Sequence, residues 1–172
     1  MWAIAFDSSE RVGVAAALAT ALLVGGCAAY GPSASVVGQP IAQAERDLGP
    51  PTARYPMPDG STRVEFARGP FGRHTWMLDV DAQGRVVRSE QVLGEARFQS
   101  VRDGMSTDEL LRLIGRPGET RPGGWAGGEV WNWRYPTNDC LWFEVSVRDG
   151  RVKAPGYAID PRCDPPSDGW SS

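Results

Sequence analysis

Residues 104–117 read GMSTDELLRLIGRP, and this stretch decides the fold. Ser106 suits the N-cap of a helix, and Glu109 three residues later completes a capping box. Gly115 can adopt the left-handed conformation that ends a helix, and Pro117 prevents its continuation. The apolar stripe between these signals consists of Leu110, Leu111 and Ile114. The stretch therefore predicts one short helix.

The same pattern recurs earlier in the chain, over residues 38–51. Gly38 and Gly49 are 11 residues apart, as are Gly104 and Gly115, and a proline follows two residues after the second glycine in each stretch. A fixed spacing that returns once indicates a diverged internal duplication. Two tandem units, each beginning with a helix, are therefore expected.

Strand patterns follow each of these helices. Residues 130–135 and 141–147 alternate apolar and polar side chains, and the turn at 148–150 leads into a return strand that begins with Arg151 and Val152. In the first unit the matching segments are 63–68, 76–80 with Trp76, Leu78 and Val80 on one face, and 85–92 after a turn at 81–84. A short helix is expected over 96–102. The predicted fold class is α+β, with a helix and a three-stranded antiparallel sheet in each unit.

The second unit contains distinctive motifs at residues 98–106, 115–117, 133–135 and 149–152. Together they resemble a known family, the SmpA/OmlA (BamE-like) lipoprotein domain. The similarity covers about residues 97–153 and is weaker over 36–93. It implies a helix-helix-three-strand fold on an outer-membrane lipoprotein that supports β-barrel assembly or envelope integrity through protein contacts. The upstream unit and two extra cysteines depart from the family pattern, which favours a paralogue over the assembly subunit itself.

Tandem units of this shape also resemble the β-lactamase inhibitory proteins, in which two copies form a concave sheet that grips an enzyme. This resemblance implies an alternative function, an anchored inhibitor or binding module for a periplasmic or extracellular enzyme. The candidate partner-binding residues are Trp125, Trp133 and Tyr135, because tryptophan and tyrosine dominate binding hot spots. Strand tryptophans at 131, 133 and 142 also suit the core, whereas Trp125 lies in a glycine-rich loop at 122–128.

An apolar run at residues 12–24 ends in Leu23-Val24-Gly25-Gly26-Cys27, which resembles a bacterial lipobox. Its length fits the roughly 7–15 residues of a secretory signal better than the roughly 20 of a spanning helix. The resemblance implies cleavage of residues 1–26 and lipid on Cys27, with Ala28 directing the protein to the periplasmic side of the outer membrane. The segment before the run is not basic, so the start codon stays open, and the alternative is a buried N-terminal helix.

The remaining boundaries follow from composition. Apart from Tyr30, residues 27–35 are small or turn-forming and predict a flexible tether, and residues 164–172 predict a disordered tail. The two units are assigned to residues 36–94 and 95–163.

Cys140 and Cys163 form an even pair in an exported domain, which is typical of a disulfide. A metal or redox pair is the alternative. It lacks a CxxC motif and has only His74 to draw on.

Charge and chemistry exclude several function classes. The formal charge of −3 becomes 17 minus 19, or −2, after cleavage, which does not indicate a nucleic-acid surface. His74 is expected in a loop that enters a strand, and Asp79 and Asp81 are expected to be solvated on one strand face ahead of a turn. Neither a phosphate loop nor a metal-ligand cluster is recognised in the sequence. We therefore expect no enzyme activity, no cofactor and no metal.

Overall fold

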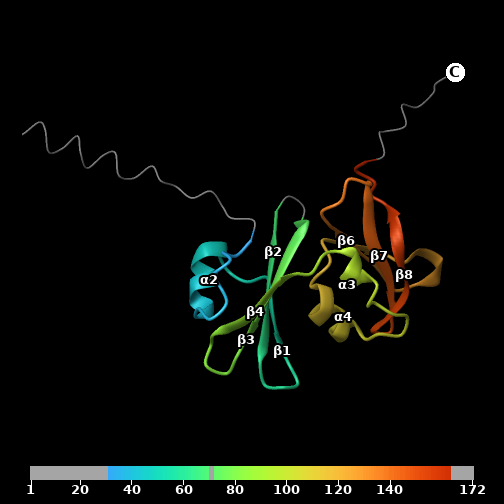
Figure 1. Ribbon diagram of the computed structural model, residues 1–172. Coiled ribbons are helices and arrows are strands. Elements are labelled where there is room, and N and C mark those ends of the chain that lie inside the picture. Colours follow the sequence, from blue (N-terminus) through green and yellow to red (C-terminus); the bar gives the residue numbers. More distant parts are fainter. Residues whose placement is uncertain (1–30, 70–71, 164–172) are drawn as a thin grey trace, which may run out of the picture.

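The computed structural model describes residues 31–69 and 72–163, which form an α+β fold with two four-stranded antiparallel sheets (Figure 1). Sheet 1 runs in the order β1 (Ala53–Pro56), β2 (Thr62–Arg68), β3 (His74–Val80) and β4 (Val86–Gln91). Sheet 2 runs in the order β5 (Glu119–Pro122), β6 (Glu129–Arg134), β7 (Leu141–Arg148) and β8 (Arg151–Ile159). The helices are α2 (Ile41–Leu48), α3 (Glu95–Phe98), α4 (Thr107–Ile114) and the 3-10 turn η3 (Gly124–Ala126).

The strand count corrects the sequence expectation of three strands per sheet. The added strands, β1 and β5, are four residues long and carry arginine and proline in place of an apolar alternation. Such short edge strands have no periodic signal, and they form because β2 and β6 offer a pairing edge. β8 is also longer than expected and continues through Pro155 to Ile159.

The helix α4 forms as its sequence predicts. The backbone N–H of Glu109 donates to Ser106 Oγ at 3.2 Å, and the N–H of Ser106 donates to Glu109 Oε2 at 2.9 Å. This capping box satisfies two of the N–H groups that a helix start leaves unpaired. The helix ends at Gly115, whose φ of 80° only glycine adopts readily.

Each helix start is bonded to the last hairpin of its own sheet. The N–H of Gly38 donates to the carbonyl of Val86 at 2.7 Å, and the N–H of Gly104 donates to the carbonyl of Val152 at 2.8 Å. The residue numbers in these two bonds differ by the same 66 positions. An arginine side chain in each hairpin reinforces the contact by donating back to the glycine carbonyl.

The elements stack in four layers. The helix α2 covers one face of sheet 1, where Trp76, Leu78 and Val80 point as expected. The helices α3 and α4 lie between the two sheets, packed on sheet 2 (Figure 1). Met77 of sheet 1 joins this second core, so β3 is buried on both faces. Each large side chain buried in these cores contributes roughly 1.5–3 kcal/mol.

A buried carboxylate joins the two halves of the molecule. Glu65 on β2 is 0% exposed and points toward the loop after α4. Its carboxylate accepts hydrogen bonds from Tyr55 Oη at 2.6 Å and from the backbone N–H of Arg116 at 3.2 Å. Burial raises the pKa of Glu65, and burial followed by the hydrogen bond to Glu65 raises the pKa of Tyr55. We call this contact the Glu65 junction.

Gly115 fits the Glu65 junction because it lacks a side chain. A Cβ at this position would lie 2.9 Å from Thr75 Cγ2 and 3.0 Å from Glu65 Cδ. The carbonyl of Gly115 accepts a hydrogen bond from Trp133 Nε1 at 3.1 Å. Gly115 therefore ends α4 and also lets sheet 1 approach the end of this helix closely.

Candidate partner-binding site

The Trp125 loop, residues 122–128 between β5 and β6, carries the most exposed large side chain described in the structure. Trp125 has a relative exposure of 109%. Figure 1 shows its short 3-10 turn, in brown, beyond sheet 2 on the side away from α2. The ring of Trp125 therefore projects into solvent.

Two backbone hydrogen bonds between glycines hold this loop closed. The N–H of Gly123 donates to the carbonyl of Gly128 at 3.0 Å, and the N–H of Gly127 donates to the carbonyl of Gly124 at 3.1 Å. A Cβ on Gly128 would meet the Val147 carbonyl oxygen at 2.2 Å, so the loop base lies against β7. The hydrogen bonds and the close approach hold the base of the loop, while Trp125 at its tip has no covering side chain.

Trp133 and Tyr135, the other two candidates, lie in the core with exposures of 1% and 5%. Trp133 is tied to Gly115, and Tyr135 packs edge-on against Phe98 with ring centroids 5.2 Å apart. Buried positions cannot meet a partner, so the structure corrects the expectation for these two side chains. They face inward because β6 and the residue after it, Tyr135, lie against the core that α3 and α4 share with sheet 2.

The outer face of sheet 2 holds a buried ion pair that the sequence did not reveal. Arg134 donates to both oxygens of Asp160, at 2.5 and 2.8 Å, and both side chains are 5% exposed. The guanidinium also lies 4.9 Å from the ring centre of Trp142. The hydrogen bond from Arg134 lowers the pKa of Asp160. This pair fastens the end of β8 to β6 and leaves no free charge for catalysis at these two residues.

The two predicted disulfide partners meet beside this ion pair. The N–H of Asp160 donates to the Cys140 carbonyl, and the N–H of Cys163 donates to the Asp160 carbonyl, both at 2.9 Å. Both cysteines are free thiols in the structure, and a hydrogen bond with Cys140 raises the pKa of the Cys163 thiol. The fold thus brings the pair together, while the disulfide itself stays a prediction.

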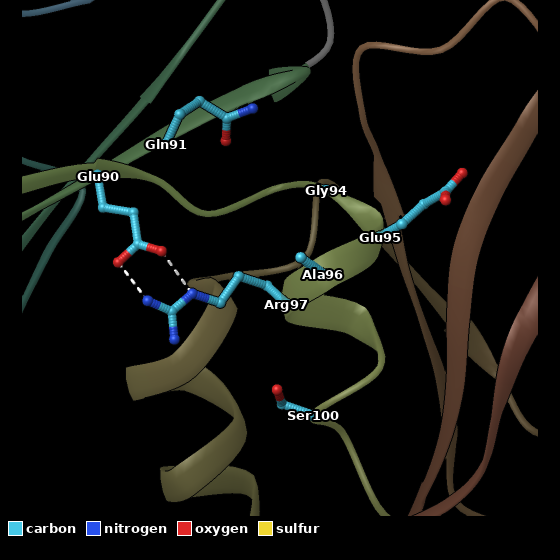
Figure 2. A pocket seen from close by; sticks show the side chains of 7 residues that line it. All are labelled: Glu90, Gln91, Gly94, Glu95, Ala96, Arg97 and Ser100. Carbon is cyan, nitrogen blue, oxygen red and sulfur yellow. Dashed lines mark hydrogen bonds and ion pairs between the residues drawn. The ribbon is translucent and has the colours of Figure 1, made fainter.

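A pocket of about 470 Å³ lies between the end of β4 and α3 (Figure 2). On one side Arg97 donates to both carboxylate oxygens of Glu90. The side-chain amide of Gln91 donates from Nε2 to the carbonyl of Leu93 and accepts at Oε1 from the backbone N–H of the same residue. Each of these three polar side chains thus has its hydrogen-bond partners, and the Glu90–Arg97 pair holds sheet 1 to α3. They therefore present no nucleophile or free base.

The remaining titratable residues that the sequence singled out have structural roles. His74 is the first residue of β3. Asp79 accepts two hydrogen bonds from Arg63, at 2.6 and 2.9 Å, and Asp81 Oδ1 accepts from the N–H groups of the following turn. Asp79 is therefore paired within sheet 1, which corrects the expectation of a solvated carboxylate there, whereas Asp81 makes exposed hydrogen bonds in the turn after β3.

Residues 31–69 and 72–163 contain neither a recognisable metal site nor a membrane-spanning helix. Within these ranges no group of three or more His, Cys, Asp or Glu side chains could hold a metal ion. No helix in the described part of the chain is long and apolar enough to cross a membrane. The expected signal segment 1–26, Cys27, the first residues of the tether and the tail 164–172 lie outside the described residues.

No family model matches the chain. No curated protein matches it either. Among solved structures, a Streptococcus mutans protein described as "putative beta-lactamase inhibitor protein" is similar at 15% sequence identity. The similarity covers 70% of this chain and 83% of that chain, with a TM-score of 0.31.

Proposed function

We propose that this chain is a lipid-anchored, non-enzymatic protein-binding module of the outer membrane whose main contact is Trp125. The observation that carries the proposal is the full exposure of this ring on a loop whose base is fixed by glycine contacts. A tryptophan buried in an interface contributes a large apolar area and an N–H donor at a small cost in side-chain entropy. Exposing such a ring to water has no benefit for the folded monomer, which supports a role in binding.

The proposed location of this protein at the outer membrane is supported by its N-terminal sequence. The lipobox-like segment ending at Cys27 supports cleavage and lipid attachment, and Ala28 supports the outer membrane over the inner one. Several acyl chains would hold the protein permanently, since a single chain anchors only marginally. The recurring helix-to-hairpin bonds, offset by 66 residues, support an origin by tandem duplication.

The partner class we favour is the protein machinery that assembles β-barrels or maintains the envelope. The support for this class is the resemblance of residues 97–153 to the SmpA/OmlA domain. In this account the lipid places the chain at the membrane, and the Trp125 loop contacts a membrane-associated protein.

An anchored inhibitor or binding module for a soluble enzyme is the second candidate. It is favoured by the position of the Trp125 loop, which lies on the side of the molecule away from α2 (Figure 1). Because the tether leads into α2, a loop on the opposite side would reach into the aqueous space and away from the anchor. A single aromatic ring on a narrow loop also suits a concave partner surface.

Site-specific crosslinking separates these candidates. A photoreactive amino acid replaces Trp125 in cells, and the crosslinked products are identified by mass spectrometry from detergent-solubilised membranes. Barrel-assembly or envelope proteins would support the first candidate, and a soluble enzyme would support the second. The matched control places the same amino acid at Val87, an apolar residue on β4 that is 53% exposed. If Trp125 yields no product beyond those of Val87, the proposal is refuted.

A further inference from the structure

A second pocket, of about 260 Å³, opens at the end of sheet 2 beside the start of α3. It is separate from the Trp125 loop and from the pocket of Figure 2, although Glu95 lines both pockets. The lining consists of Glu95, Gln99, Tyr135, Asp139, Leu141 and Tyr157. We call it the tyrosine pocket. Two aromatic rings, two carboxylates and no basic side chain therefore line it, as far as the described residues go.

The two tyrosine rings form an angled wall. Their centroids are 6.2 Å apart and their planes meet at 53°. Tyr135 is buried, whereas Tyr157 is 46% exposed and forms the outer side of the wall. Phe98 of α3 contacts both rings from behind, at 5.2 Å and 6.2 Å. The rings are thus held in place, and the exposed ring of Tyr157 is available to a group that enters from solvent.

The carboxylates give the pocket a negative potential. The side chain of Glu95 points away from the Glu90–Arg97 pair and toward the strands of sheet 2 (Figure 2). No hydrogen bond or ion pair of the Glu95 carboxylate is found within the described residues. Burial, followed by the electrostatic influence of Glu95, raises the pKa of Tyr135 above its usual value, and Asp139 adds to this effect. A negative potential beside exposed aromatic faces favours a cation.

The neighbouring pocket shows what such a carboxylate accepts in this protein. There Glu90 binds the guanidinium of Arg97 through two parallel hydrogen bonds. Glu95 lies only five residues further along the chain, with equivalent chemistry and no arginine of its own. The chain supplies the cation in the first pocket and leaves the second without one.

We propose that the tyrosine pocket receives an arginine side chain from a partner protein. A planar guanidinium can stack on a tyrosine face and donate to a carboxylate at the same time, which the more strongly hydrated ammonium of lysine does less well. Glu95 and Asp139 would accept its hydrogen bonds, and the exposed ring of Tyr157 would stack on its face. The site stands independently of the Trp125 loop, because none of its residues belongs to that loop.

The test uses a small arginine probe and the full chain. The 15N-labelled protein is titrated with N-acetyl-argininamide, and the amide signals of Gln99, Asp139 and Leu141 are followed by NMR. We expect saturable shifts with a dissociation constant on the order of 1–10 mM, as befits a ligand of this size. The neutral isostere N-acetyl-citrullinamide is expected to give no saturable shift. Absence of saturation with the arginine probe at about 50 mM would overturn the proposal.

Variants identify the groups that bind the probe. Glu95→Gln is expected to weaken binding about threefold to fivefold, and the double variant with Asp139→Asn is expected to abolish saturation. The control Asp108→Asn removes an 80% exposed carboxylate of α4 and is expected to leave binding unchanged. Equal weakening by the control, or equal affinity for N-acetyl-lysinamide, would contradict an arginine-specific site.

Discussion

Replacing Gly115 by alanine tests whether sheet 1 packs against the end of α4 as described. The backbone at Gly115 has φ 80° and ψ −174°, a region that residues with a Cβ avoid at a cost of about 1–3 kcal/mol. The new Cβ would also press on Thr75 at 2.9 Å and on Glu65 at 3.0 Å. Overpacking of this kind costs about 1–3 kcal/mol more. The expected total loss in the free energy of unfolding is therefore about 2–6 kcal/mol.

Gly49 provides a matched control for the backbone cost. It ends α2 with φ 82° and ψ −171°, and the nearest atom to its Cβ would be Arg68 Nη2 at 3.8 Å. Gly49→Ala is therefore expected to lose only the backbone contribution. The assay is urea unfolding of both variants, followed by tryptophan fluorescence. We expect Gly115→Ala to lose about 2 kcal/mol more than Gly49→Ala. Losses equal within about 0.5 kcal/mol would show that Gly115 does not lie in a tight contact between sheet 1 and the end of α4.

Three further predictions concern charge and the membrane anchor. Because burial raises the pKa of Glu65, its stabilising contribution is complete below its ordinary pKa of 4.5 and is lost as pH rises through the raised value. The wild type should therefore lose stability relative to Glu65→Gln from pH 4.5 upward in urea unfolding, and a difference that does not vary with pH would contradict this. Asp160→Asn leaves the Arg134 charge buried with only the partly exposed carboxylate of Glu119 beside it. Thermal unfolding should therefore show a loss in stability of about 3 kcal/mol, and a loss under about 1 kcal/mol would argue against the pair. Mass spectrometry of the mature protein from membranes should find lipid on an N-terminal Cys27 that Cys27→Ala abolishes, whereas an unmodified chain starting at residue 1 would defeat the proposed anchor.

The parts of the fold that depend on local sequence were predictable. The helix α4 follows from the reciprocal bonds of Ser106 and Glu109 and from the terminating Gly115, all within ten residues. The turn into β8 likewise follows from Asp149 and Gly150, both of which have positive φ. Signals of this kind act over a few residues, so one chain is enough to recognise them.

Features that depend on contact between distant residues were not predictable. Glu65 stands between Val64 and Phe66, so alternation places it on a solvent face of β2, yet α4 and the loop after it cover that face. The apolar Met77, which alternates with Trp76 and Leu78, is the only local signal that the second face of sheet 1 is also covered. The Arg134–Asp160 pair joins β6 to the end of β8 and leaves no mark on local periodicity.

One candidate site was likewise predictable from local sequence, and the other was not. The glycine-rich composition of residues 122–128 distinguishes the Trp125 loop from the strands, and the ring is indeed exposed. The tyrosine pocket combines Glu95 of α3 with Tyr135 and Tyr157 near the ends of β6 and β8. No spacing in the sequence connects these residues, because the sheet brings them together.

The most direct test of the account measures how much Trp125 contributes to binding. Once the partner is identified by crosslinking, its dissociation constant is measured by calorimetry for the wild type, for Trp125→Ala and for the control Val87→Ala. A central tryptophan of an interface contributes about 2 kcal/mol or more, so Trp125→Ala should weaken binding at least about 30-fold while the control stays near the wild type. An affinity within about twofold of the wild type for Trp125→Ala would contradict the claim that this protein acts through the Trp125 loop.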